Sequence, residues 1–195
     1  MSARETILAN IMANQPVSQD LPQIDLQAVI HYDNVLQQFK TVLESIGGKT
    51  LEIKDWQELQ AMMESDQAAG KRIINAISEL GNIDETLSTM KAEELAMVQR
   101  AYIKAGIAVA ENGSVWVDEA AMVNRLLPFI AEHLVLVIEQ KNIVANMHHA
   151  YQQVASFETG FGMFLAGPSK TADIEQSLVI GAHGARSLLV CILPS

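Results

Sequence analysis

Apolar residues along the chain follow two kinds of spacing. Over residues 3–13 and 26–46 they recur at steps of three and four, which predicts two helices. Elsewhere they form short runs rich in β-branched residues, which predict strands. These runs cover residues 50–53, 71–77, 107–110, 115–117, 133–138 and 187–193.

Local signals complete this outline. Asp55 is a natural cap for a third helix, and residues 95–102 and 143–154 also show apolar positions at helical spacing. Asn112-Gly113 separates two β-prone runs. Because both residues tolerate positive φ, this dipeptide predicts a tight hairpin.

The alternation of helices and strands is typical of a sheet covered by helices. The run at 134–138 is compatible with a parallel strand buried on both faces, and the hairpin adds an antiparallel element. We therefore predict an α/β fold with three layers and a mixed sheet, in preference to a helical bundle. We expect a single domain over residues 1–195, with residues 1–24 forming a peripheral helix and a connector.

Composition excludes several classes of protein. A net charge of -10 argues against nucleic-acid binding, which requires clustered Lys and Arg. Cys191 is the single cysteine and lies in an apolar run, so it predicts core packing, and the chain cannot supply four thiolates to an iron-sulfur cluster. No apolar run is long enough to span a bilayer and the start has no secretory pattern, so we expect a cytoplasmic protein.

The segment from Gly160 to Arg186 carries the most chemical information. An apolar strand passes into the polar turn Gly167-Pro168-Ser169-Lys170-Thr171-Ala172-Asp173-Ile174-Glu175, and Gly181-Ala182-His183-Gly184 follows. Two glycines beside an imidazole allow close approach by main chain or ligand.

These phrases, together with the turn Glu111-Asn112-Gly113-Ser114, resemble the LUD-domain family, the group that includes lactate-utilisation protein C. The resemblance covers the second half of the chain. Lys170 stands where the family often has Arg, and Ala182 and Ala185 stand where Val and Pro are common. Lys keeps the positive charge but lacks the planar fork of Arg, which weakens any transfer of substrate from another member.

The resemblance implies a fold similar to the CoA-transferase and ribose-phosphate-isomerase group. It also implies a part in the oxidation of L-lactate to pyruvate beside separate iron-sulfur proteins. We see neither a cysteine cluster nor a dinucleotide-binding glycine motif, so we expect no cofactor in this chain, clusters in partner proteins, and an accessory subunit.

Ser169, Lys170 and Thr171 allow two interpretations. Their hydroxyls, the charge of Lys170 and the amides of a helix start would hold a carboxylate or phosphate, with Gly167 and Gly184 giving space for it. Alternatively, Ser169 caps an ordinary helix. Both interpretations stay open at this point.

The catalytic candidates are His183, Asp173 and Glu111. His183 would orient a carboxylate or exchange a proton, with Asp173 or Glu175 as its acidic partner, although a lone histidine is more often structural. Glu111 would place a carboxylate at the mouth of a pocket, or would simply be exposed on a turn. His148-His149 lack the spacing of a helical metal site, so we predict no metal ligands.

Two further hypotheses stand beside the role in lactate utilisation. In the first hypothesis, the chain is an independent enzyme or binding protein for a small anionic metabolite, with a CoA-transferase-like fold. Alternatively, it would be a regulatory or scaffolding domain. The sequence is also compatible with a homo-oligomer.

Overall fold

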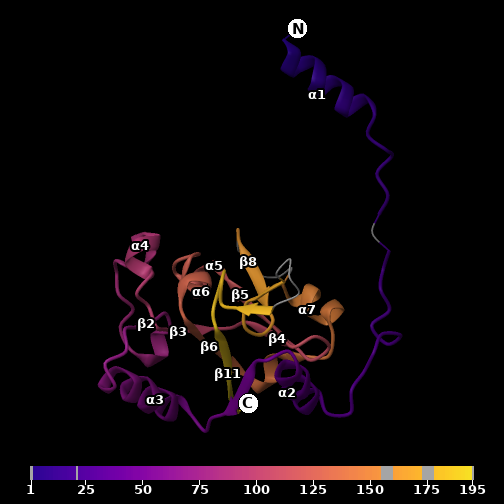
Figure 1. Ribbon diagram of the computed structural model, residues 1–195. Coiled ribbons are helices and arrows are strands. Elements are labelled where there is room, and N and C mark those ends of the chain that lie inside the picture. The colour runs from indigo at the N-terminus through magenta and orange to yellow at the C-terminus, as the bar shows by residue number, and fades with distance from the viewer. Residues whose placement is uncertain (1, 21, 155–159, 173–177, 195) are drawn as a thin grey trace.

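The computed structural model describes residues 2–20, 22–154, 160–172 and 178–194 (Figure 1). Its central sheet has five strands in the order β1-β11-β6-β3-β2, and each neighbouring pair is parallel. The strands are β1 (Lys49–Glu52), β11 (Ser187–Leu193), β6 (His133–Glu139), β3 (Arg100–Lys104) and β2 (Ile73–Asn75). The predicted run at 133–138 is therefore the middle strand, and residues 134–138 are buried as expected for a parallel sheet with both faces covered.

A second sheet of four strands contains the predicted hairpin. Its order is β7 (Ile143–Val144), β4 (Ile107–Val109), β5 (Ser114–Asp118) and β8 (Gly162–Leu165). Strands β4 and β5 are antiparallel and meet at Gly113, whose φ of 69° suits a residue without a side chain. A smaller antiparallel pair consists of β9 (Lys170–Ala172) and β10 (Leu178–Ile180).

Three helices of at least two turns pack on these sheets. They are α2 (Val35–Ser45), α3 (Trp56–Ala68) and α7 (Met147–Val154). Asp55 accepts a hydrogen bond from the main-chain N of Glu58 and caps α3, as predicted. The short helices are α4 (Ala92–Leu95), α5 (Glu119–Met122) and α6 (Leu127–Ile130), and 3-10 turns cover Ser78–Leu80, Leu87–Thr89 and Gln140–Asn142.

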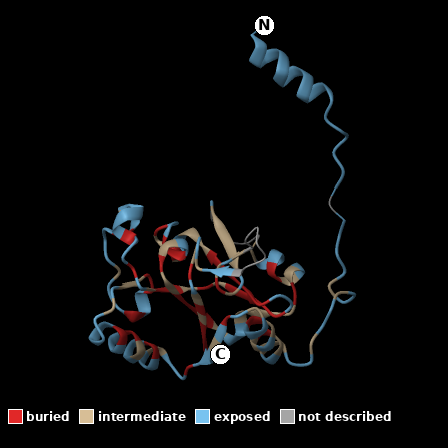
Figure 2. Cartoon of the chain, viewed as in Figure 1, coloured by how far each residue is buried: buried red, intermediate tan, exposed pale blue. Residues whose placement is uncertain are grey.

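The core is divided by the central sheet. Leu134 and Leu136 of β6 pack with α2 and with β4 and β5, whereas Val135 and Val137 pack with α3 on the other face. Helix α7 covers the outer face of the second sheet through Ala150. Buried residues accordingly concentrate in the central strands (Figure 2). The predicted α/β class with a helix-covered sheet is confirmed, and the antiparallel hairpin lies in a second sheet packed on the first.

Some local predictions are wrong. Residues 100–104 form β3 rather than a helix, because Ala101, Tyr102 and Ile103 are all buried in the sheet. The helix expected over 26–46 begins only at Val35, where Asn34 caps it. The helix expected from 143 begins at Met147, after β7.

Helix α1 (Ala3–Ala13) stands apart from the sheets (Figure 1). Ser2 and Glu5 form the predicted capping box at its start. Every described residue from Ser2 to Asp20 is exposed (Figure 2). Among the described residues, no helix is both long and apolar enough to cross a lipid bilayer.

Candidate functional site

The main chain of Ser169 joins the two glycine-containing segments. Its N–H donates to the carbonyl of Ala185 at 2.9 Å, and its carbonyl accepts from the N–H of Gly181 at 3.0 Å. The turn after β8 and the turn before β11 therefore lie side by side.

Two glycines make this approach possible. A Cβ added to Gly184 would lie 3.0 Å from the Cβ of Ser169, so a larger residue would push the two turns apart. Gly167 has φ of +73°, and a Cβ there would lie 2.9 Å from the carbonyl oxygen of Ile46 at the end of α2. The turn at Gly167 is thus fixed against α2 by close main-chain contact.

These turns border a cavity of about 370 Å³. Five of the predicted site residues line it, namely Gly167, Ser169, Lys170, His183 and Gly184. Its apolar side comes from Pro128, Phe129, Leu134, Phe164, Leu165, Ala166, Pro168, Ala185 and Leu188. The side chain of His183 is exposed, so a ligand in the cavity can reach the imidazole.

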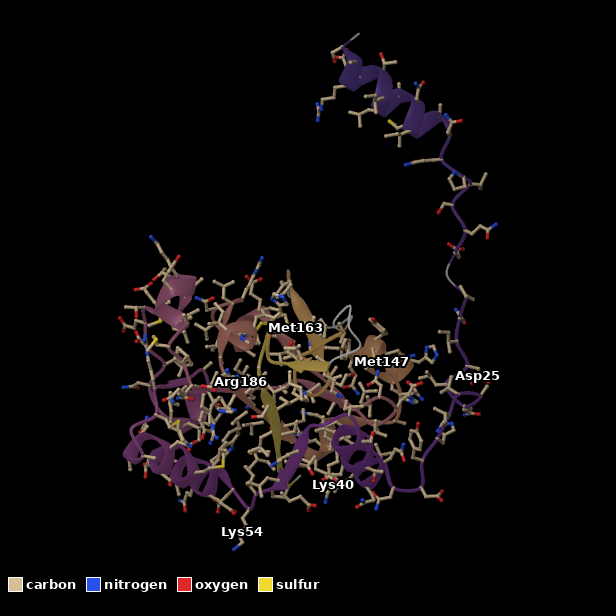
Figure 3. The ribbon with its side chains drawn as sticks, viewed as in Figure 1. Asp25, Lys40, Lys54, Met147, Met163 and Arg186 are labelled. Atoms are coloured by element: carbon tan, nitrogen blue, oxygen red, sulfur yellow. The ribbon has the colours of Figure 1, made fainter. Side chains whose placement is uncertain are left out.

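A second hollow of about 340 Å³ adjoins the first and shares Phe129, His183 and Gly184 with it. This hollow adds two charged residues, Glu132 and Arg186. Arg186, labelled in Figure 3, donates from Nη1 to Oε1 of Glu132 at 2.7 Å. His183 therefore stands between a mainly apolar space and a charged one.

Lys170 has a structural contact as well as a place in the cavity wall. Its Nζ donates to the carbonyl of Ile46 at the carboxyl end of α2, where the helix dipole favours a positive charge. An ammonium group has three donors. Lys170 is exposed, so its charge can act on the helix end and on an anion in the cavity together.

The predicted helix start at Ser169 is wrong, because residues 170–172 form β9. Thr171 pairs with Val179 of β10 and is not among the residues that line the cavity. Helix-start amides consequently play no part at this turn. Polar groups for a ligand come instead from Ser169, Lys170 and His183.

The other catalytic candidates lie elsewhere. Glu111 is exposed, and its Oε2 accepts a hydrogen bond from the main-chain N of Met147 at 2.9 Å, at the start of α7. Asp173 and Glu175 lie outside the described residues. Within the described part of the chain, no group of three or more His, Cys, Asp or Glu side chains is arranged to hold a metal ion.

Sequence reasoning missed Glu132 and the apolar wall around Phe129. Both lie just before β6 in the sequence, where a buried strand was predicted but no site. Leu134 and Leu188 are each the second residue of a strand, so the cavity lies at the amino ends of β6 and β11. Most open α/β sheets bind ligands at the carboxyl ends of their strands, and that rule would have pointed to the edge opposite this cavity.

A buried group of charges was also missed. Asp66 of α3 accepts hydrogen bonds from Nζ of Lys71 at 2.5 Å, from Oη of Tyr102 at 2.8 Å and from Nη1 of Arg100. Burial acts to raise the pKa of Asp66, but the hydrogen bonds from Lys71 and Tyr102 and the charge of Arg100 outweigh it and lower the pKa. These contacts fix the end of α3 to β3.

Comparison with known proteins bears on the family and the fold of the chain. The LUD domain family model matches residues 83–193. "Lactate utilization protein C" of Shouchella clausii is 33% identical over 84 residues, which are 40% of this chain and 36% of that protein. "Lactate utilization protein C 1" of Bacillus mycoides is 23% identical over 173 residues, which are 80% of this chain and 70% of that protein.

The fold is also similar to a solved structure. The crystal structure of a DUF162 family protein from Deinococcus radiodurans matches with a TM-score of 0.64 at 17% identity, over 82% of this chain and 96% of that chain. At this identity the match bears on the fold alone. The family model, by contrast, spans more than half of the sequence, and on that ground the chain belongs to the LUD-domain family.

Proposed function

We propose that this chain takes part in L-lactate utilisation by holding a small carboxylate in the cavity between residues 164–170 and 183–185. One observation carries the proposal: the two motifs that define the resemblance line the same hollow, joined through the main chain of Ser169. The names of the relatives supply the link to lactate.

The wall of the cavity suits such a ligand. Ser169, Lys170 and His183 offer donors to a carboxylate, and Phe129 and Leu134 offer apolar contact to a methyl group. A volume of about 370 Å³ falls within the range of sites for small molecules.

Oxidation of L-lactate to pyruvate removes two electrons and two protons. In the proposed step His183 accepts the proton of the ligand hydroxyl, and the C–H bond at the same carbon breaks, its proton and two electrons passing to an acceptor outside this chain. The electrons need an acceptor, and the one cysteine of the sequence, Cys191, is buried in β11 and does not face the cavity. We therefore propose that the acceptor is an iron-sulfur protein that binds this chain, and that the chain acts as an accessory subunit.

Gene deletion and complementation test the role. The host lacking this gene is grown on L-lactate and on glucose, and is given back the wild-type chain, His183→Ala or His148→Ala. His148 is also exposed but lies on α7, outside the cavity, so it is the matched control. We expect a defect on lactate alone that the wild type and His148→Ala repair and His183→Ala does not. Normal growth on lactate, in a host without another lactate oxidase, would contradict the proposal.

Ligand-dependent stability tests the site directly. A ligand that binds only the folded chain raises its stability by about 2.7 kcal/mol at one hundred times its dissociation constant. L-lactate or pyruvate should stabilise the wild type and His148→Ala, and should stabilise Lys170→Ala and His183→Ala less. Equal stabilisation of all these chains would remove the cavity as the site.

A larger anionic metabolite is a second candidate, and the adjoining hollow favours it. That hollow, of about 340 Å³, would extend the cavity past His183 toward Arg186. The same stability assay with longer carboxylates and with phosphate esters separates the two. If only the longer anions stabilise the chain, an independent metabolite-binding role replaces the part in lactate use.

A further inference from the structure

Helix α1 has an apolar stripe that the described chain leaves uncovered. Ile7, Leu8, Ile11 and Met12 are 59%, 47%, 55% and 73% exposed. They form two pairs four residues apart, so they lie on one face of the helix. A helix of 11 residues is marginal in water by itself, and most helical stability in proteins comes from packing of such a face. A stable α1 therefore needs a surface to cover its stripe.

The body of the protein has a suitable surface beside the candidate site. A hollow of about 510 Å³ is lined by Gly70, Arg72, Ala96, Met97, Val98, Gln99, Ile130 and Glu132. Met97 is 68% exposed, and neighbouring Phe129 on α6 is 44% exposed. The hollow shares Ala96, Ile130 and Glu132 with the one that contains Arg186, so it continues the same surface.

We propose that α1 docks in this hollow of its own chain, with Ile7, Leu8, Ile11 and Met12 against Met97, Phe129 and Ile130. The stripe of α1, Met97 and Phe129 are all exposed, and contact would remove their apolar surface from water. Arg72 at the border of the hollow and Glu5 at the start of α1 carry opposite charges, whereas Glu132 is already paired with Arg186.

The length of the connector favours docking within one chain. Asn146 holds the main-chain carbonyl of Ile30 at 3.0 Å, and 16 residues lie between Ala13 and Ile30. Fully extended, they reach about 55 Å. Residues 25–28 form a turn, so this length is an upper bound. A body of about 165 residues is about 40 Å across, and the connector together with α1 is long enough to span it. Asp25 marks this connector in Figure 3. A tethered helix has an effective concentration on the order of millimolar, above that of a second copy in dilute solution.

Docking has a consequence for the cavity. Phe129 belongs to the wall of the cavity and to the adjoining hollow, so α1 packed on it would cover one side of the entrance near His183. Ligand exchange would then depend on release of α1. This consequence rests on the proposed function, whereas the docking does not.

Paramagnetic broadening in the full-length chain tests the docking. Cys191 is buried and burial raises its pKa to about 12, so a thiol reagent labels an added cysteine in preference to it. Asn10→Cys, which lies outside the stripe, carries a nitroxide. In dilute isotope-labelled protein we expect amide signals of Ala96, Met97 and Ile130 to lose most of their intensity, while signals from α7 keep theirs.

Matched variants locate the contact. Ile7→Gln with Ile11→Gln should restore the lost signals, and Thr6→Gln, on another face, should not. On the body, Met97→Gln should restore them, and Tyr151→Gln, at a residue that is also well exposed (59%), should not. Urea unfolding confirms that each variant is folded.

Two results would overturn the inference. Uniform signals with no broadening near Met97 would show that α1 does not dock there. In a mixture, spin-labelled chains without isotope are added to isotope-labelled chains without spin label. Broadening in that mixture would identify a second copy as the occupant instead.

Discussion

Two groups of charged side chains lie at the amino ends of the central strands, and their surroundings differ. Asp66 is buried, and Lys71, Tyr102 and Arg100 all donate to its carboxylate. His183 is exposed and lines an open cavity with Lys170. The first group satisfies its charges inside the protein, whereas the second presents donors to a ligand. Substitutions should therefore separate stability from binding.

The largest effect is expected at Asp66. Asp66→Asn keeps the shape of the side chain but leaves the charges of Lys71 and Arg100 without a counter-ion. We expect a loss of about 3 kcal/mol, at the low end for a broken buried pair because Lys71 keeps some solvent access. Urea unfolding measures it. Glu52→Gln is the control, since it breaks the exposed pair with Lys40 and should cost less than about 1 kcal/mol.

The next effect concerns the main chain of the cavity. Gly70 and Gly167 have similar φ, +77° and +73°, but a Cβ at Gly70 would meet nothing within 4 Å. Gly70→Ala should cost about 1 kcal/mol for its backbone conformation alone. Gly167→Ala should cost about 1 kcal/mol more, because its Cβ would crowd the carbonyl of Ile46. Equal losses in urea unfolding would mean that the turn moves freely away from α2.

At low pH the difference in the free energy of unfolding between the wild type and Asp66→Asn should become smaller. The folded-state pKa of Asp66 lies below its ordinary value, so its contribution is complete above about pH 4 and is lost as the pH falls through the folded pKa. Unfolding of both chains near neutral pH and at about pH 3 measures this. A gap that stays constant would show that the charge of Asp66 does not stabilise the fold.

The smallest effect on stability is expected at His183. The side chain is exposed, and His183→Ala should change the free energy of unfolding by less than about 0.5 kcal/mol. The same variant should lose ligand binding. A large loss of stability would place His183 with Asp66 as a structural residue.

Sequence patterns predicted the elements whose signals are local. The cap at Asp55, the hairpin at Gly113 and the buried run of β6 each depend on residues within one short stretch. The site was predicted in part for the same reason, since the two motifs hold five of the residues that line the cavity.

The rest depends on partners far away in the chain. Ala101 to Ile103 form a strand because β2 and β6 lie on either side, although their spacing with Leu95 is helical. The turn at Ser169 starts a strand because β10 pairs with it. Asp66 accepts a hydrogen bond from Tyr102, 36 residues away, and no local pattern in the sequence predicts that contact.

Strand β11 lies between β1 and β6 and hydrogen-bonds to both. During synthesis, β1 and β6 leave the ribosome long before β11 follows, and each then carries an open edge able to pair with another chain. The sheet closes only when residues 187–193 emerge. Until then, both open edges expose the nascent chain to pairing with other chains.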